Sequence, residues 1–240
     1  MPSMAPSREP LSDSNPNDSA KELQIDLPQD EFQALYLKKD YKAAVDYLVA
    51  NKQQFKEGQF HYNLGTLYSK MDDFANARFH FEKAIKDGYI NNAALNNLNF
   101  VKEKLAVDDL STSTAKMDQI INGALSIPLS GYGFISLLFI LIVLILVRVQ
   151  KIQRRFIIIG AILLSMSPFL VAKFYIGNIN QAIVLKDLTL FEGPSKIFEE
   201  KGKIRAGSKI ILGEYKDGWF FVEFPQSLGG WVSKENLGLY

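Results

Sequence analysis

The side chains best suited to acid–base or metal chemistry are scarce in this sequence. It contains two histidines, His61 and His80, and no cysteine. His61 falls at a packing position of an expected helix, and His80 lies beside Phe79 and Phe81 on the following helix. We therefore interpret both histidines as structural residues rather than as metal ligands or general bases. The lack of cysteine also excludes disulfides, thiolate metal sites and cysteine nucleophiles.

Motifs of the common enzyme classes are missing as well. The sequence has no phosphate-binding loop, no GxSxG nucleophile elbow and no HExxH helix. It therefore favours a protein that is not an enzyme and that needs no metal or cofactor. An enzyme in the C-terminal part, with a catalytic carboxylate pair that no motif marks, stays an alternative. The 27 basic and 26 acidic side chains give a net charge of +1, so we expect no nucleic acid as a partner.

A repeated helical pattern in the first half favours binding instead. The run from Tyr62 to Tyr68, followed by Ala77 to Ala84, has the spacing of a tetratricopeptide repeat. Its small residues, such as Gly65, allow paired helices to approach closely. The run from Asp40 to Leu48 repeats the second-helix pattern thirty-three residues earlier. We predict about two and a half such repeats over residues 23–110, forming an α-helical solenoid.

Repeat modules of this kind bind peptides or proteins on their concave face. Asparagines on such a face can hold a peptide backbone by paired hydrogen bonds. The alternative is that these residues are ordinary solvated helix positions. The residues expected to line the peptide groove are Tyr36, Tyr62, Asn63, Thr66, Lys70, Asn97 and Lys104.

The last part of the chain, residues 180–240, changes to short β-rich runs separated by turn residues. Gly193-Pro194-Ser195, Asp217-Gly218 and Gly229-Gly230 mark turns between runs such as Trp219 to Val222. The order resembles a bacterial SH3-type domain, which implies a small all-β barrel. Alternatively, residues such as Trp231 and Val222 belong only to its core. An aromatic groove for peptide would consist of Tyr215, Trp219, Phe220 and Trp231.

Two apolar segments between these modules are long enough to cross a bilayer. The stretch Ile127 to Val147 has 21 residues without a charge, which at ~1.5 Å per residue gives about 31 Å. Phe156 to Ala172 is a shorter uncharged run that Lys173 can extend by snorkelling. Pro168 predicts a kink, satisfied by Ser165 or by packing on the first helix. We predict membrane helices over 127–149 and 156–176, preceded by a juxtamembrane helix over 111–126.

The loop between the two spans, residues 150–155, sets the expected orientation. The outer flanks of the spans hold only Lys116 and Lys173. The positive-inside rule therefore places the loop in the cytoplasm and both modules on the opposite face, the periplasm of a bacterium. Residues 1–22 are rich in proline and serine without an apolar run, which predicts a disordered tail rather than a signal peptide. The cations that orient the hairpin are Arg148, Lys151, Arg154 and Arg155.

The combined order of helical repeats, two spans with a short basic loop and an SH3-type module resembles the Bat family of membrane proteins, specifically the BatE type of aerotolerance operons. The resemblance covers nearly everything after Leu27. It implies a noncatalytic scaffold in the bacterial inner membrane that works beside von Willebrand A-domain membrane proteins, and indirectly a MoxR-type ATPase, in envelope or oxidative-stress tolerance. A second hypothesis is an envelope sensor whose SH3-like module binds peptidoglycan peptide.

Overall fold

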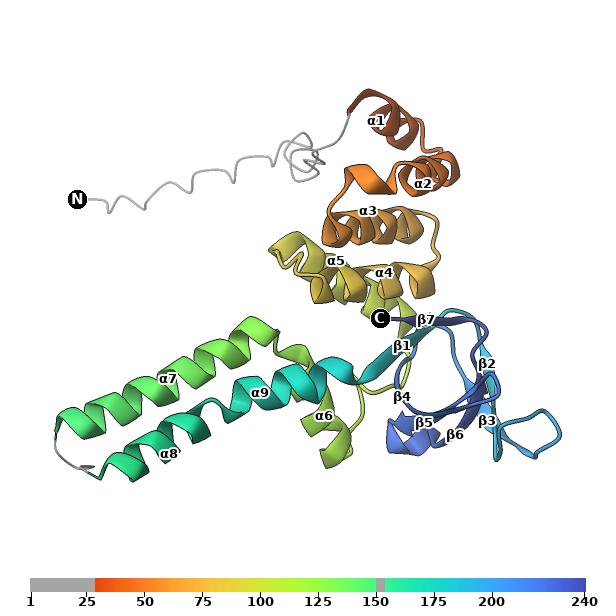
Figure 1. The fold of residues 1–240 in the computed structure, drawn as a ribbon. Helices are drawn as coiled ribbons and strands as arrows, with labels where there is room; N and C mark the ends of the chain where they lie inside the picture. The colour runs from red at the N-terminus through yellow and green to blue at the C-terminus, as the bar shows by residue number, and fades with distance from the viewer. Residues whose placement is uncertain (1–28, 150–153) are drawn as a thin grey trace, which may run out of the picture.

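The computed structural model describes residues 29–149 and 154–240. Within these ranges the chain forms a stack of helices, a long helical hairpin and a β-sheet (Figure 1). The predicted tail, 1–22, and most of the predicted basic loop, including Lys151, lie outside the described residues.

The first part of the chain is a stack of helices in which each packs on its neighbour in the sequence (Figure 1). Two hydrophobic clusters lie inside the stack, one around Phe32 and Leu67 and one around Phe81 and Val101. A 3-10 turn, Lys52–Gln54, precedes the third helix. The helices are α1 (Gln29–Leu37), α2 (Tyr41–Ala50), α3 (Glu57–Lys70), α4 (Phe74–Lys86) and α5 (Asn92–Leu105).

The turns before α2 and α4 are built alike. A residue with positive φ, Lys39 in the first turn and Asp72 in the second, comes directly before the capping aspartate. Asp40 accepts a hydrogen bond from the backbone N–H of Ala43 at 3.1 Å, and Asp73 accepts one from the N–H of Asn76 at 3.2 Å. Each cap satisfies one of the free N–H groups at a helix start. The spacing seen in the sequence therefore corresponds to matched local structure.

Close contact between α3 and α4 depends on Gly65. A Cβ atom at this position would lie 2.8 Å from the ring of Phe81, which is fully buried. Ala77 and Ala84 are buried on the same side of α4. The small residues therefore allow the close helix approach that the sequence predicted.

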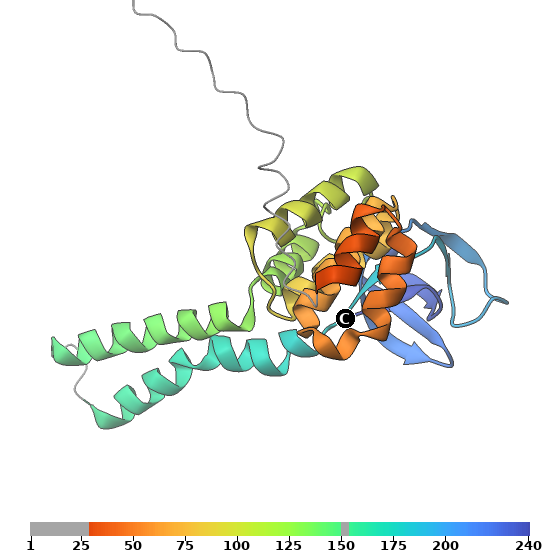
Figure 2. The ribbon, with the colours of Figure 1, turned by 90° about the horizontal axis from the view of Figure 1, so that it is seen from above.

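A hairpin of apolar helices follows the linker helix α6 (Lys116–Ser126). Its first arm is α7 (Leu129–Arg148), and its second arm is α8 (Arg155–Ser165) continued by α9 (Ser167–Phe174). Both arms are long and apolar enough to cross a membrane, and few of their side chains are buried. The arms contact each other and project away from the rest of the molecule in both views (Figures 1 and 2).

The second arm breaks where Pro168 enters it. Pro168 stands in the first turn of α9, directly after the boundary with α8. Ser165 donates its hydroxyl to the carbonyl of Ala161 at 2.7 Å, and Ser136 of α7 accepts the backbone N–H of Phe169 at 3.2 Å. Of the two solutions expected from the sequence, the contact of Phe169 with Ser136 shows the packing on the first arm. The Ser165 hydroxyl bonds within α8 and does not reach the carbonyl of Leu164, which Pro168 leaves without its helical donor.

The C-terminal part is an antiparallel sheet of seven strands in the order β3-β2-β6-β5-β4-β1-β7. Its core contains Ala182, Leu190, Ile210 and Val222 from four different strands. Two 3-10 turns, Ile176–Asn178 and Gln226–Leu228, flank the first and sixth strands. The strands are β1 (Asn180–Val184), β2 (Leu188–Phe191), β3 (Glu200–Ile204), β4 (Lys209–Lys216), β5 (Trp219–Phe224), β6 (Gly230–Ser233) and β7 (Leu237–Leu239).

The sheet is open, whereas the sequence analysis predicted a small closed barrel. β3 and β7 occupy the two ends of the strand order and do not pair with each other, so the sheet is not closed into a barrel by hydrogen bonds. The sequence analysis did not single out either strand. β3 is a charged and mostly exposed edge strand, and β7 has only three residues, so neither carries a clear apolar alternation.

The helical stack and the sheet are in direct contact. α4 lies against β1, and the end of β7 reaches the underside of α4 (Figure 1). We refer to α1–α6 together with the sheet as the head. Seen from above, the hairpin leaves the head on one side (Figure 2).

Candidate functional site

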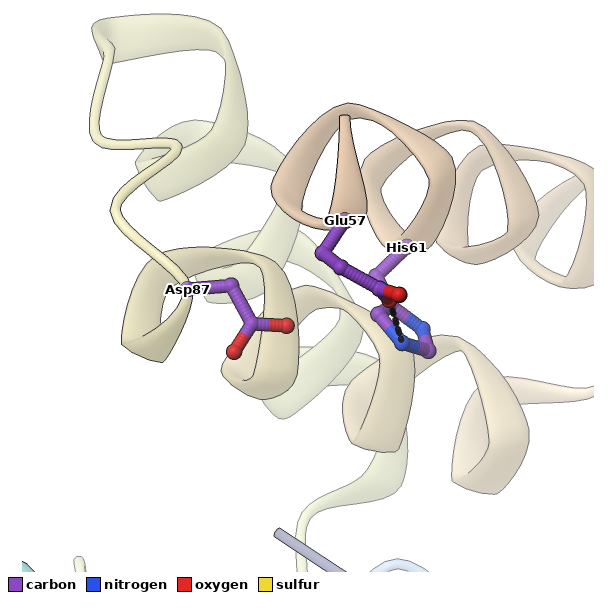
Figure 3. A group of neighbouring side chains, drawn as sticks. All are labelled: Glu57, His61 and Asp87. Atoms are coloured by element: carbon purple, nitrogen blue, oxygen red, sulfur yellow. Dashed lines mark ion pairs between the residues drawn. The ribbon is translucent and has the colours of Figure 1, made fainter. Parts of the chain in front are cut away.

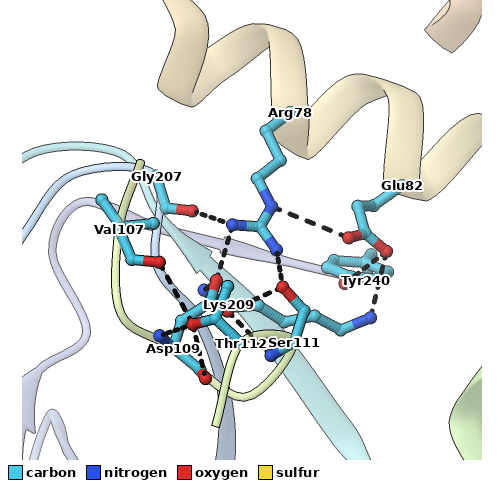
Figure 4. Close-up of polar contacts among 9 residues, drawn as sticks. All are labelled: Arg78, Glu82, Val107, Asp109, Ser111, Thr112, Gly207, Lys209 and Tyr240. Atoms are coloured by element: carbon cyan, nitrogen blue, oxygen red, sulfur yellow. Dashed lines mark hydrogen bonds and ion pairs between the residues drawn. The ribbon is translucent and has the colours of Figure 1, made fainter. Parts of the chain in front are cut away.

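A buried arginine lies at the centre of the contact between the helical stack and the sheet. Arg78 of α4 is 1% exposed and is the largest fully buried side chain among the described residues. Its Nη1 donates to Asp109 Oδ2 at 2.6 Å and to the carbonyl of Gly207 at 2.9 Å, and its Nη2 donates to Ser111 Oγ at 3.1 Å (Figure 4). One guanidinium thus joins α4, the linker after α5 and the loop before β4.

Asp109 is satisfied by several donors at once. Besides Arg78, its carboxylate accepts the backbone N–H of Lys209 at 2.8 Å, the backbone N–H of Ser111 at 2.7 Å and the Ser111 hydroxyl at 2.7 Å. Leu110 donates its N–H to the carbonyl of Lys209 at 3.2 Å. A buried charge is stable only when it is paired and hydrogen-bonded, and Asp109 meets both requirements.

A second ion pair extends the network toward the last residue. Lys209 Nζ donates to Glu82 Oε2 at 3.0 Å, and the Tyr240 hydroxyl donates to the same oxygen at 3.4 Å (Figure 4). Burial alone would raise the pKa of Glu82, but Lys209 and Arg78 outweigh it, so that pKa is lowered. Burial, followed by the charge of Glu82, raises the pKa of Tyr240 well above its ordinary value. At neutral pH the network therefore contains an ionised Glu82 and a neutral Tyr240.

Tight apolar contacts surround these charges. Gly207 has φ +88° and lies against the side chain of Leu105 at the end of α5. A Cβ at Gly238 in β7 would lie 2.6 Å from the ring of Phe79 in α4. Because polar and apolar contacts coincide, the helical stack and the sheet form one packed unit.

The sequence analysis did not identify this network. Asp109 and Lys209 lie far from Arg78 in the sequence, so no local spacing connects them. The only available signal was the position of Arg78 directly after Ala77, on the face of α4 that a repeat buries. An arginine at such a place needs a buried partner.

An aromatic surface lies on the face of the sheet opposite its core, on strands β2, β5 and β6. Phe221 and Trp231 are cross-strand partners with ring centroids 5.7 Å apart. Trp219 lies on the same face, and its ring is 5.4 Å from that of Phe191, the strand partner of Trp231. Trp219, Phe221 and Trp231 are each half-buried. We call these four residues the aromatic face.

The aromatic groove predicted from the sequence is divided between the two faces. Phe220 packs against the core with Val222 and Val232, and Tyr215 is its strand partner at a ring distance of 4.7 Å. Trp219 and Trp231 point to the opposite face because side chains alternate along a strand. The four predicted residues therefore do not form one groove. The aromatic side chains beside Trp219 and Trp231 are instead those of Phe191 and Phe221.

The residues predicted for a peptide groove in the helical stack are also divided. Tyr62, Asn63 and Thr66 of α3 are buried, with exposed fractions of 7%, 3% and 8%, whereas Lys70 and Lys104 are exposed. Thr66 donates its hydroxyl to the carbonyl of Tyr62 at 3.0 Å. The three buried side chains are packing residues here, because the register of α3 turns them toward neighbouring helices.

The two remaining groove residues contact other side chains of the stack. Asn97 of α5 donates its amide to the Tyr62 hydroxyl at 3.3 Å. Half-buried Tyr36 stacks on Phe32 and meets the edge of Tyr41. The structure brings Tyr62 and Asn97 into direct contact, and Tyr62 is also near enough to Tyr36 to raise its pKa, after the larger effects of burial and Tyr41.

The described cations Arg148, Arg154 and Arg155 are exposed and lie at the end of α7 and the start of α8. These two helix ends form the tip of the hairpin, away from the head (Figure 1). The placement of these cations at one end of two apolar arms is the arrangement on which the predicted orientation depends.

Among the residues that the structure describes, one group of three side chains has ligand atoms close enough together to bind a metal ion. Glu57 and His61 of α3 and Asp87 after α4 have ligand atoms within 4.8 Å of one another (Figure 3). Lys52 pairs with Glu57 at 3.2 Å and Lys83 pairs with Asp87 at 3.6 Å, so both carboxylates already have cations beside them. We therefore assign no metal to this group.

The two histidines form a pair of their own. The Nδ1 atoms of His61 and His80 are 2.9 Å apart, so one ring donates and the other accepts. Burial lowers the pKa of His61 to about 4 and that of His80 to about 3, and the two rings are neutral at pH 7. The pair therefore links α3 to α4.

Comparison with known proteins adds no family to these observations. No protein-family model matches the sequence, and searches of curated proteins and of solved structures found no match.

Proposed function

We propose that this chain is a noncatalytic, membrane-anchored scaffold whose head binds other proteins of a Bat-type envelope or oxidative-stress complex. The observation that carries the proposal is the buried contact of Arg78 with Asp109 and Gly207. It holds the helical stack and the sheet in one orientation, so a single partner assembly can engage both. In this proposal the helical stack consists of tetratricopeptide-like repeats, supported by the matched caps Asp40 and Asp73, and the sheet is an SH3-like module.

The anchor in this proposal is the hairpin of α7 and α8–α9. Exposed apolar surface on this scale is unfavourable in water, whereas the 20 residues of α7 at ~1.5 Å each match a hydrocarbon layer of about 30 Å. The basic tip would lie in the cytoplasm and the head in the periplasm of a bacterium, by the positive-inside rule.

The expected partners are von Willebrand A-domain membrane proteins, and through them a MoxR-type ATPase. The aromatic face is the surface we assign to them, because half-buried tryptophan and phenylalanine side chains dominate many protein interfaces.

Affinity purification of the full-length chain from detergent-solubilised membranes tests this function. Membrane A-domain proteins should be enriched by the wild-type chain and at least about tenfold less by Trp219→Ala/Trp231→Ala, as expected for two hot-spot residues. Tyr215→Ala is the matched control, since Tyr215 lies on the other face of the sheet. If an unrelated two-span membrane protein enriches A-domain proteins equally well, the proposal is wrong.

A cell-wall sensor is the second candidate, and the aromatic face also favours it, because such surfaces accept extended peptide chains. Sedimentation of the full-length chain with purified sacculi distinguishes the two. Loss of sedimentation in Trp219→Ala/Trp231→Ala, without any enrichment of A-domain proteins by the wild type, would favour the sensor.

A further inference from the structure

A cavity of about 430 Å³ lies where the head meets the hairpin. Its walls come from α4 and α5 of the helical stack, from α6, from β1 and β4 and from Tyr240. The first turn of α7 and the end of α9 complete it. The helical stack, the sheet and the hairpin therefore all contribute to this cavity.

Positive charge predominates in the cavity wall. Lys86, Lys102, Lys173 and Lys209 line it, against a single carboxylate, Glu82, which already pairs with Lys209. Among the residues that the structure describes, no carboxylate lies within ion-pair distance of Lys86, Lys102 or Lys173. Three lysines thus line a common space without an ion pair. Lys102 is half-buried, whereas Lys86 and Lys173 are exposed and their Nζ atoms lie over the rings of Tyr240 and Phe174.

The environment of two of these lysines favours an anion. Burial is the largest cause that lowers the pKa of Lys86 and of Lys102. Nearby cations, including Lys209, lower both pKa values as well, whereas Asp87 raises that of Lys86, and Glu82 and Asp109 raise that of Lys102. A bound anion would raise both, because it favours the charged form of each lysine.

Apolar side chains also line the cavity, and several of them belong to the ends of the hairpin. They include Leu98 of the helical stack, Ile127 before α7, Leu129 in its first turn and Ile176 after α9. Because α7 is about as long as the hydrocarbon layer is thick, its first turn lies at the hydrocarbon boundary when the hairpin spans the membrane. The cavity then opens at the level of the lipid headgroups.

We propose that the cavity binds one anionic phospholipid of the surrounding bilayer, with the phosphate held by Lys86, Lys102 and Lys173 and the upper acyl chain against Leu129 and Ile176. Lysine ammonium groups hold phosphate by charge and by hydrogen bonds, and basic pockets beside membrane helices suit anionic headgroups. The inference rests on the membrane anchoring in the proposed function. The proposal goes beyond that function by adding a bound lipid that contacts both the head and the hairpin.

Thermal unfolding of the full-length chain in micelles of an uncharged detergent tests the proposal. Short-chain phosphatidylglycerol is titrated against short-chain phosphatidylcholine and against glycerol phosphate, at constant ionic strength. A ligand that binds only the folded state stabilises it by RT ln(1 + [L]/Kd), so the Tm begins to rise near Kd and then increases with the logarithm of the ligand concentration. We expect this rise to begin at a lower concentration of phosphatidylglycerol than of the other two ligands.

Lys86→Gln/Lys102→Gln should weaken this response at least about tenfold in apparent Kd, because hydrogen bonds from charged groups are lost. Lys42→Gln/Lys203→Gln, which removes two exposed charges far from the cavity, should leave it unchanged. An unchanged response in Lys86→Gln/Lys102→Gln overturns the proposal. An equal response to phosphatidylcholine overturns recognition of the anion, and an equal response to glycerol phosphate identifies a site for free phosphate instead of lipid.

Native mass spectrometry of the wild-type chain provides a readout that does not depend on the folding of a variant. After exchange into equal amounts of phosphatidylglycerol and phosphatidylcholine, the retained lipid should be mainly phosphatidylglycerol, and equal retention contradicts the proposal. Alkaline washing of membranes separates this inference from the proposed function. A chain that stays in the membrane without preferring phosphatidylglycerol overturns only the lipid site, whereas a chain released by the wash overturns the anchor.

Discussion

Arg78 carries a full charge in a position that water does not reach. Removing a charge from water costs several kcal/mol, and only good hydrogen-bond geometry on the partner groups offsets that cost. Arg78 and Asp109 have such geometry, with Gly207, Ser111 and the backbone of Lys209 completing the set. The pair therefore specifies one docking of the stack on the sheet rather than simply adding stability.

Arg78→Met should destabilise the head by about 3–5 kcal/mol, because it leaves Asp109 buried without its cation. At roughly 2–4 °C per kcal/mol for a domain of this size, the Tm should fall by about 10 °C. Thermal unfolding in uncharged detergent measures the change.

The double variant Arg78→Met/Asp109→Asn is the control, since it removes both charges. Its Tm should lie above that of Arg78→Met alone. A single variant with the wild-type Tm would mean that the ion pair does not join the modules.

The histidine pair makes stability depend on pH. The folded-state pKa of His61, about 4, and of His80, about 3, both lie below the ordinary value of 6.5, chiefly because of burial. The folded state thus resists protonation that the unfolded chain accepts. The stabilisation is complete above about pH 6.5 and is lost as the pH falls from there toward 4 and 3.

We therefore expect the Tm to fall between pH 7.5 and pH 5, before acid protonates Glu82. His61→Gln/His80→Gln should flatten this dependence, with Tm measured at both pH values. An equal slope in the double variant would assign the effect to other groups.

At the scale of elements, alanine substitution of two helical glycines should change the free energy of unfolding in opposite directions. A Cβ at Gly65 would overlap the ring of Phe81 on α4, and the ring atom nearest the backbone is among those affected, so the side chain cannot swing clear. Gly65→Ala should cost about 1–3 kcal/mol by overpacking. Gly123→Ala in α6 meets nothing within 4 Å and should add up to about 1 kcal/mol through helix propensity.

Chemical denaturation of the two variants and of the wild type measures the free energy of unfolding, and so tests both the predicted loss and the predicted gain. Stabilisation by Gly65→Ala would show that α3 and α4 are not in close contact.

The whole molecule combines a rigid head with a hairpin, and this combination predicts its topology. The two modules cannot occupy opposite sides of a membrane, because the Arg78 network and the contacts of Gly207 and Gly238 join them. If both arms of the hairpin cross the membrane, as we propose, they return the chain to the side from which it started. The basic tip then lies alone on the other side.

The chain has no cysteine, so single cysteines report topology without background. Lys42→Cys in α2 and Lys203→Cys in β3 should react with an impermeant maleimide on intact spheroplasts, and Arg155→Cys should react only after lysis. Different accessibility of Lys42→Cys and Lys203→Cys would contradict a single head. Reaction of Arg155→Cys alone would reverse the orientation.

Local patterns in the sequence were sufficient to locate most elements. Apolar run length marked both arms of the hairpin, the runs Asp40 to Leu48 and Ala77 to Ala84 marked α2 and α4, and Gly218 marked the turn before β5. These signals work because helix capping, turn geometry and burial in a bilayer depend on residues close together in the chain. The charged strand β3 escaped prediction because an exposed edge needs no apolar alternation.

Which residues lie together in the candidate sites depends on the tertiary structure. The alternation of strand side chains separated Trp219 from Phe220, and the register of α3 buried Tyr62, although sequence spacing placed each in a groove. The pairing of Arg78 with Asp109 and the meeting of Lys86, Lys102 and Lys173 around one cavity join residues from distant segments. Such contacts depend on how whole elements pack, and no short-range pattern in the chain encodes that packing.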